Sequence, residues 1–382
     1  MNIGSTIKKL RRAKDMTQED LAEYLNVSVS AVSQWEAGKT APDLSLIPPL
    51  CSLLNVTSDE LLGIDLEAKQ KRIDEITDEA HSYSSRGYGK RAHEILSAGL
   101  REFPDSFEIM FFLMYDSFNS SRDNSYSKEE RERFRDEAVR IAELILEKCT
   151  DDGKRHSAIQ ILCFIYPEIG KRERAAELAG KMPTMVISKE FLATRIYSGS
   201  EGYESDKYLL DNLIQHLSNQ IVASGRKRDN GEFYYTDDDR AVLRDKRIAF
   251  LELMYEDGDM GFYHCHLART HENQARYYAK GANAAKTLAH LEKAAEHAIG
   301  FVKYAAAINN THTYTCTSLL FRDHTHNTSF TTGSSENDAM ELLRDMEASI
   351  YDFVRDKPEF VAVTDRLKVY ADKWEPAGKL KQ

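Results

Sequence analysis

Apolar residues recur at helical spacing through the first 40 positions of the chain. Each group of them lies three or four positions apart, which is the repeat of one helix face. The groups predict a helix over 3–14, a second beginning near Thr17 and a third beginning near Ser28. In chain order the residues sharing a face are Ile3, Ile7 and Leu10, then Leu21, Ala22 and Leu25, then Ala31, Val32 and Trp35.

The second and third predicted helices are short and closely spaced. Thr17 and Ser28 have side chains that can cap a helix N-terminus. Asn26 lies between the two helices and tolerates the left-handed backbone conformation that a tight turn requires. Two helices joined in this way predict a helix-turn-helix, whose second helix lies in the major groove of DNA.

Two further helical segments complete the first 65 residues. Pro42 and Asp43 predict the start of a fourth helix, with Pro49 distorting its first turn because it cannot donate a backbone hydrogen bond. The segment 58–63 predicts a capped final turn ended by glycine. Five helices around one small core are expected.

From residue 66 to about residue 370 the pattern is also helical, since glycine and proline are sparse and strand-like alternation is rare. Segments 80–104 and 163–183 look alike. In both, a first helix ends at a glycine, a second begins with a small residue, and a proline closes the unit. Further pairs are expected at 261–275 with 281–298, and at 338–353 with 360–373. The polar run 321–336 predicts a loop.

Composition and charge limit the function. At 382 residues and 42% hydrophobic content, the chain is expected to hold two or more packed domains. It opens without an export signal and has five widely spaced cysteines, so reduced thiols and a cytoplasmic location are expected. Residues 1–65 hold six Lys and Arg and nine Asp and Glu, a net charge of −3 within a total of −11. We expect weak non-specific DNA affinity and a need for dimerisation.

Residues 3–64 resemble the phage-repressor-like helix-turn-helix family, also called the Xre or Cro/C1 type. The resemblance rests on 17–22, 27–28, 31–39, 42–43 and 61–63. It implies that Gln18 bonds a DNA phosphate, that Lys39 lies near the DNA backbone and that Arg11 pairs with Glu36. The expected DNA-binding residues are Thr17, Gln18, Ser28, Val29, Ser30, Ser33, Gln34 and Lys39.

The residue types at these positions suit base recognition. Gln34 can bond adenine through two hydrogen bonds, Ser30 can serve several bases, and Val29 can contact a thymine methyl group. A·T pairs are therefore expected at key steps of the site. Trp35 is expected in the core because it shares a face with Val32.

The helix pairs of residues 66–382 resemble degenerate tetratricopeptide repeats, with a generic helical bundle as the alternative. The resemblance implies an α-helical solenoid with a concave groove. That body is expected to serve dimerisation, or to bind a short peptide or a protein partner. Asn309, Asn310 and some tyrosines could line such a groove.

The sequence predicts no enzyme, no cofactor and no metal site. On one helix His264 and His266 point about 200° apart, and His271 lies two turns from His264, too far for the two to share an ion. No phosphate loop or nucleophile elbow is found. We expect an all-α, sequence-specific transcription regulator with a DNA-binding domain over 1–65 and a repeat domain over 66–382. The alternative is a protein-interaction scaffold whose helix-turn-helix does not read DNA specifically.

Overall fold

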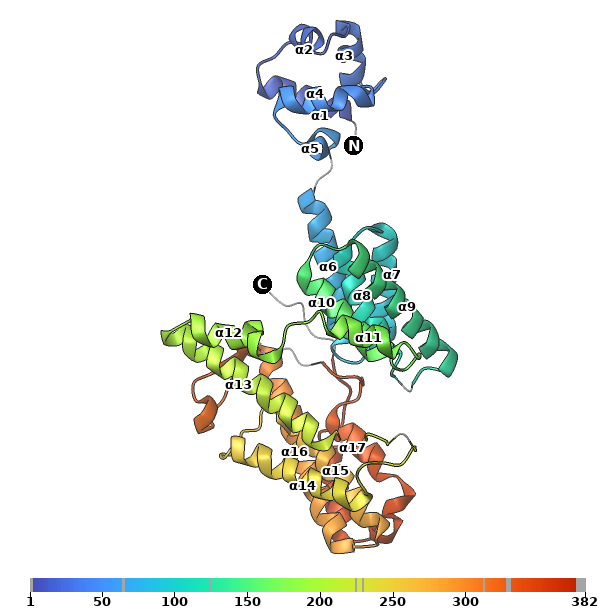
Figure 1. The fold of residues 1–382 in the computed structure, drawn as a ribbon, viewed down its shortest axis with the longest axis vertical. Helices are drawn as coiled ribbons and strands as arrows, with labels where there is room; N and C mark the ends of the chain where they lie inside the picture. Colours follow the sequence, from blue (N-terminus) through green and yellow to red (C-terminus); the bar gives the residue numbers. More distant parts are fainter. Residues whose placement is uncertain are drawn as a thin grey trace. The chain divides into compact units, whose positions relative to one another are not determined.

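The computed structural model describes residues 3–63, 66–123, 125–223, 225–228, 230–311, 313–327 and 331–375. The chain divides into two compact units, Met1–Ile76 and Thr77–Gln382 (Figure 1). Nearly all regular structure is helical, so the predicted all-α class is confirmed. The predicted domain boundary falls at Asp65, which lies outside the described residues. No helix in the described ranges is long and apolar enough to cross a membrane.

The first unit consists of short helical segments around one apolar core. They are α1 (Ile3–Ala13), α2 (Gln18–Tyr24), α3 (Val29–Glu36), the 3-10 turn η1 (Leu44–Leu46), α4 (Ile47–Leu54) and α5 (Ser58–Leu62). The core side chains that lose all solvent exposure are Ile7, Leu21, Val32, Leu50 and Leu61. Trp35 is 5% exposed and belongs to the same core, as predicted.

The start of the fourth helix differs from the prediction. Asp43 caps η1 by accepting a hydrogen bond from the Ser45 backbone, and α4 begins only at Ile47. Pro48 and Pro49 then lie in the first turn of α4, where backbone N–H groups have no partner within the helix. The expected distortion by Pro49 was therefore wrong, because the proline removes no hydrogen bond there.

The second unit begins with a run of helices, and from the second of them onward each packs against the next. They are α6 (Leu66–Ser84), which begins in the first unit, α7 (Gly89–Glu102), α8 (Phe107–Ser120), α9 (Lys128–Lys148), α10 (Asp152–Ile165) and α11 (Arg172–Ala179). The two similar sequence segments are the pairs α6–α7 and α10–α11. Gly87 and Gly170 both have a backbone φ of 77°, and Ala92 and Ala175 are buried at equivalent positions. The predicted tetratricopeptide-like pairing is confirmed.

The rest of the second unit is also built mainly of helices that follow one another along the chain. They are the 3-10 turn η2 (Met185–Ile187), α12 (Lys189–Ile196), α13 (Gly199–Val222), α14 (Asp237–Met254), α15 (Tyr263–Lys280), α16 (Ala284–Thr311), α17 (Asp338–Met346), the 3-10 turn η4 (Ser349–Val354) and α18 (Pro358–Lys368). The predicted pair 261–275 with 281–298 is α15 with α16. These two helices share one core with α17 and α18.

A small hairpin interrupts the helical pattern. Strand β1 (Thr313–Thr315) pairs antiparallel with β2 (Thr325–Asn327), and the 3-10 turn η3 (Leu319–Phe321) lies between them. The sequence predicted a loop over 321–336, which was wrong for β2. Three-residue strands are too short to produce a visible alternating pattern. The side chains of Asn309 and Asn310 are outside what the structure describes, so their predicted role in a groove stays a prediction.

Candidate nucleic-acid interface

Local hydrogen bonds set the turn between α2 and α3. Thr17 caps α2, and its hydroxyl accepts from the Asp20 backbone at 3.1 Å while the Asp20 carboxylate accepts from the Thr17 backbone at 2.7 Å. Ser28 caps α3 by accepting from the Ala31 backbone at 3.1 Å. Asn26 has a φ of 52°, the left-handed conformation predicted for the turn. Asn26 and Ser28 thus shape the turn from which α3 begins, and Thr17 fixes the start of α2.

Helix α3 has one buried and one exposed face. Val32 and Trp35 point into the core, and they anchor the helix to α1 and α2. The four positions expected to read bases lie together on the exposed face, namely Val29, Ser30, Ser33 and Gln34. The helix therefore presents the predicted reading residues to solvent on a rigid support.

A polar network ties the three helices together behind α3. The Arg11 guanidinium of α1 donates to the Glu36 carboxylate at 2.6 and 3.0 Å, and it also donates to the Met16 carbonyl. The Gln18 amide of α2 donates to Glu36 at 2.8 Å. Arg11 is 7% exposed, so this ion pair is screened little by solvent. The network holds α2 and α3 in one relative orientation.

The same network explains the ionisation of Glu36. Burial alone would raise the pKa of this carboxyl, but the hydrogen bonds from Arg11 and Gln18 outweigh burial and lower it. The hydrogen bond that Arg11 donates to Glu36 raises the pKa of Arg11 in turn. Both groups stay charged near neutral pH, and Glu36 serves as a structural carboxylate.

Gln18 has a position that the sequence did not anticipate. The resemblance implied a phosphate contact, whereas here one N–H of its amide is bonded to Glu36. A primary amide has two N–H donors, so the second stays available to a phosphate. Nothing in the sequence spacing linked Gln18 to Glu36, because the two residues meet only through packing of α2 on α3.

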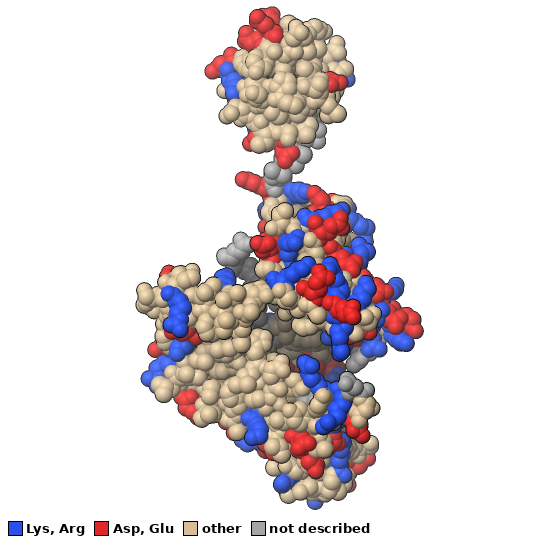
Figure 2. All heavy atoms as spheres, in the orientation of Figure 1, with Lys and Arg blue, Asp and Glu red and all other residues tan. Residues whose placement is uncertain are grey.

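The basic side chains near this face are few. Lys14 donates to the Leu53 carbonyl at 2.9 Å, so its ammonium group is held by α4. Lys39 is exposed just beyond α3. Figure 2 shows separate small groups of acidic and basic atoms on the visible face of the first unit, with mostly uncharged surface between them. The electrostatic contribution to DNA affinity is therefore expected to be modest.

In the body, histidines of α15 pack against histidines of the next helix, α16. His264 and His271 of α15 contact His297 and His290 of α16, with Nδ1–Nδ1 distances of 2.9 and 3.0 Å respectively. Spacing along the sequence relates positions on one helix only, so it could not reveal these contacts between two helices. Across the described residues, no group of three or more His, Cys, Asp and Glu is arranged to hold a metal ion.

Comparison with known proteins agrees with the structure of the first unit. A helix-turn-helix family model matches residues 7–61. The chain is 42% identical over 63 residues to the HTH-type transcriptional activator BcrR of Enterococcus faecalis, covering 16% of this chain and 31% of BcrR. The chain thus spans less than a third of that curated relative's length.

Two more comparisons differ in coverage. The uncharacterized HTH-type transcriptional regulator YazB of Bacillus subtilis is 36% identical over 58 residues, which cover 15% of this chain and 84% of YazB. The crystal structure of Bacillus thuringiensis PlcR in complex with the peptide PapR7 and DNA aligns with 81% of this chain and 98% of PlcR. Its sequence identity is 13% and its TM-score 0.29. Because the first unit matches most of YazB, the chain belongs to the repressor-like (Xre or Cro/C1-type) helix-turn-helix family of transcriptional regulators.

Proposed function

We propose that this protein is a sequence-specific, DNA-binding regulator of transcription. The observation that carries the proposal is the two-faced helix α3, which buries Val32 and Trp35 and exposes Val29, Ser30, Ser33 and Gln34 together. A helix anchored in this way can enter the major groove, about 12 Å wide, without rearranging the unit. Membership of a family of transcriptional regulators supports the same function.

The reading face favours A·T pairs. The Gln34 amide lies 3.5 Å from the Ser30 hydroxyl, a weak contact that a base can replace. Gln34 then bonds the N6 and N7 atoms of adenine, and Val29, which is 41% exposed, contacts a thymine methyl group. Thr17, Gln18, Ser28 and Lys39 are proposed to contact phosphates, which fix the position of the unit but carry no sequence information.

The helical body is proposed to supply dimerisation and an effector site. Two copies of the first unit would address half-sites about 34 Å apart or a multiple of that spacing. A second half-site compensates for the shortage of basic side chains in each copy. The effector is proposed to be a short peptide or another small ligand, the site of action is the cytoplasm, and no enzymatic step is assigned to the body.

The test compares binding of the full-length protein to DNA from upstream of its own gene and to an unrelated duplex, at several salt concentrations. We expect a preference of about 100-fold or more for the first. Replacing Ser30 and Gln34 together by alanine should remove most of that preference, because base contacts carry the sequence information. A matched control replaces Ser52 and Gln70, which are exposed in the same unit. Sequence preference that survives the first replacement would exclude α3 as the reading helix.

A protein-interaction scaffold is the second candidate. It is favoured by one observation, the net charge of −3 in residues 1–65. A scaffold predicts binding that is equal for both duplexes and steeply dependent on salt, or no binding at all. The same titration therefore separates the two functions.

A further inference from the structure

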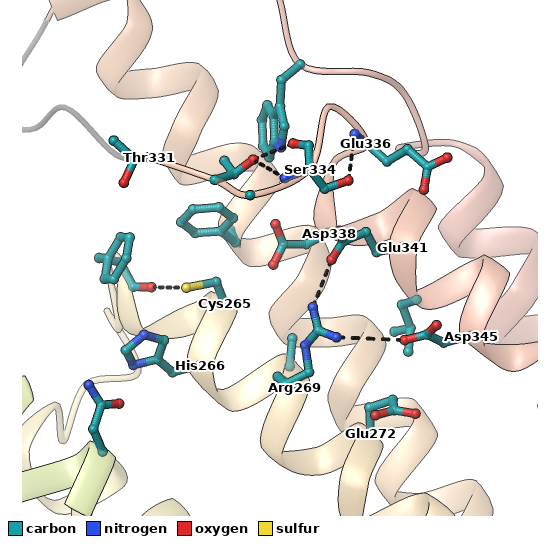
Figure 3. Close-up of a pocket in the computed structure, with 18 of the residues that line it drawn as sticks. Cys265, His266, Arg269, Glu272, Thr331, Ser334, Glu336, Asp338, Glu341 and Asp345 are labelled. Carbon is teal, nitrogen blue, oxygen red and sulfur yellow. Dashed lines mark hydrogen bonds and ion pairs between the residues drawn. The ribbon is translucent and has the colours of Figure 1, made fainter. Parts of the chain in front are cut away.

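A cavity of about 570 Å³ opens among α13, α14, α15 and α17 of the second unit (Figure 3). Its volume lies within the range of small-molecule sites. Part of its wall is aromatic and apolar, formed by Phe262, Phe301 and Leu342. Charged side chains of both signs line the rest. The identity of its ligand therefore depends on which of these charges already have partners within the protein.

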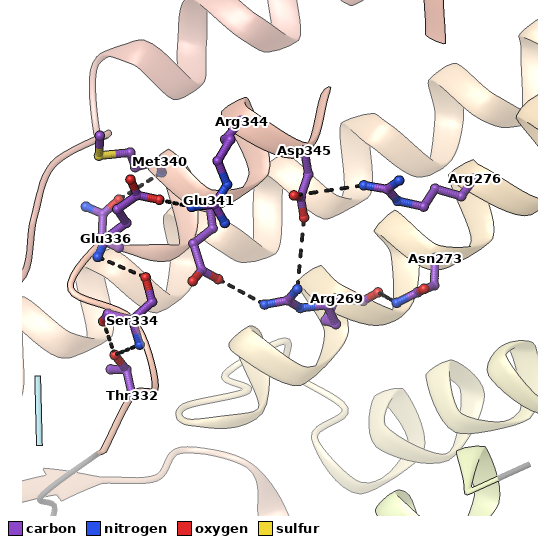
Figure 4. Close-up of polar contacts among 11 residues, drawn as sticks. Arg269, Asn273, Arg276, Thr332, Ser334, Glu336, Met340, Glu341, Arg344 and Asp345 are labelled. Carbon is purple, nitrogen blue, oxygen red and sulfur yellow. Dashed lines mark hydrogen bonds and ion pairs between the residues drawn. The ribbon is translucent and has the colours of Figure 1, made fainter. Parts of the chain in front are cut away.

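Most charges beside the cavity are neutralised by ion pairs on its rim. Arg269 of α15 lies 2.9 Å from the Glu341 carboxylate and 3.9 Å from Asp345. Glu272 contacts Arg276 one helical turn away, and Figure 4 shows Arg276 also reaching Asp345. The contacts of Arg269 and Arg276 with α17 link the two helices, and each of these rim charges has an oppositely charged partner within the protein.

The Asp338 carboxylate is different. It lies at the first position of α17 and, in Figure 3, faces the cavity that Cys265 and His266 also line. Among the described residues, no Lys, Arg or His lies within ion-pair distance of it. Burial, followed by the nearby Glu341, raises its pKa to about 7. A carboxylate in this environment is stabilised by any cation that enters the cavity.

Arg247 of α14 supplies the opposite charge. Its side chain is 8% exposed and lines the same cavity. It donates to the Ser218 hydroxyl at 3.0 Å and to the Asn219 amide oxygen at 3.4 Å, and both acceptors are neutral. Burial lowers its pKa, and the described residues place no carboxylate within ion-pair distance. A buried guanidinium without a counter-ion is costly and is stabilised by an anion.

The two charges reach the cavity from different helices, Asp338 from α17 and Arg247 from α14. Burial is the main cause of the raised pKa of the Cys265 thiol beside them, to which Asp338 adds and which Arg247 opposes. The His266 Nδ1 atom beside it is buried and has no hydrogen-bond partner. The cavity thus offers separate sites for a cation, an anion and a hydrogen-bonding group.

We propose that this cavity binds a zwitterionic ligand, with its ammonium group at Asp338, its carboxylate at Arg247 and Asn219, and its apolar part against Phe262 and Phe301. A free amino acid and a short peptide share this chemistry. The inference rests on the proposal that the body carries an effector site. It is tested without DNA, so its failure is distinct from a failure of operator binding.

The experiment is calorimetric titration of the full-length protein with leucine and with the dipeptide Ala-Leu, each also as its N-acetyl and C-amide derivative. We expect saturable binding of a free zwitterion, weakened at least about tenfold, or 1.4 kcal/mol, by either block. The C-amide tests the Arg247 pole in the unchanged protein, so no variant at that buried position is needed. Binding of leucine would identify an amino-acid ligand, and binding of the dipeptide alone a peptide ligand.

The variant D338N tests the other pole. It should weaken binding of the free zwitterion about tenfold and should bind the free and N-acetyl forms equally. The matched control D356N changes an exposed aspartate that does not line the cavity, and it should behave as the unchanged protein. The inference is wrong if no zwitterion binds at millimolar concentration, or if blocked and free forms bind equally to the unchanged protein.

Discussion

Acid should destabilise the second unit through the histidines between α15 and α16. The rings of His264, His297, His271 and His290 form a continuous column, in which His271 and His297 stack 5.6 Å apart. An Nδ1–Nδ1 contact of 2.9 or 3.0 Å needs one protonated and one unprotonated nitrogen. If both Nδ1 atoms of a pair carry a proton, two donors face each other. Burial also disfavours a positive charge on any ring, so the column is most stable while its rings are neutral.

The magnitude follows from the pKa values. Burial, with repulsion from neighbouring histidines, lowers the pKa of His271 to about 3 and that of His297 to about 4, from 6.5. Because the folded pKa is the lower one, the unfolded chain takes up protons first. The contribution of the two neutral rings to the free energy of unfolding is therefore complete above pH 6.5 and is lost as the pH falls towards 4. Between pH 7 and pH 5 each ring contributes a loss of about 2 kcal/mol, and the two together at most about 4 kcal/mol.

The assay is urea denaturation of the full-length protein at pH 7 and pH 5, followed by helix circular dichroism. The variant H297Q keeps a donor and an acceptor but cannot be protonated in this range, so it should lose about 2 kcal/mol less between the two pH values. H156Q is the control at an exposed position. An equal loss of stability in H297Q and the unchanged protein would refute the assignment of acid sensitivity to this column.

Other substitutions test single contacts by urea or thermal denaturation. S28A should destabilise the first unit by about 1 kcal/mol because α3 loses its cap. E36Q should cost about 1–3 kcal/mol because a buried guanidinium loses its counter-ion. G170A, in open space, should cost about 1–2 kcal/mol for its positive φ, whereas G87A should cost clearly more because a Cβ there would lie 2.1 Å from backbone. The folded state disfavours the charged form of Asp338, so the unchanged protein should lose stability as the pH rises from about 4 to 7, whereas D338N should not. At pH 7 the variant should therefore be the more stable of the two by about 1–3 kcal/mol.

The first unit follows closely from its sequence because its signals are local. A cap, a turn residue and an apolar face lie within a few positions of one another, so Thr17, Asn26 and Val32 could each be assigned from their neighbours. The contact of Gln18 with Glu36 could not be assigned, since it spans 18 residues and depends on how two helices pack. Local patterns thus fix the reading helix but not the network behind it.

The cavity in the body was beyond prediction for a similar reason. Its two uncompensated charges, Asp338 and Arg247, are 91 positions apart and lie on helices that only the tertiary packing brings together. In the sequence each is one of many charged residues on an apparently solvated helix. What distinguishes them is that, in the part of the chain that the structure describes, neither has an oppositely charged group within ion-pair distance, and no spacing rule reports this.

Contacts that form only through tertiary packing also explain why the two repeats differ in sequence. Gly87 and Gly170 occupy equivalent turns with the same φ, yet only Gly87 has backbone packed against it, from residues 334–335 of a distant segment. That segment is held there by a hydrogen bond from the Thr332 backbone to the Ser85 carbonyl at 3.0 Å. The α6–α7 turn must therefore keep the repeat geometry and also leave room for the crossing segment. The α10–α11 turn must keep only the repeat geometry. Two turns of the same backbone geometry thus meet different neighbours, so their sequences need not match residue for residue.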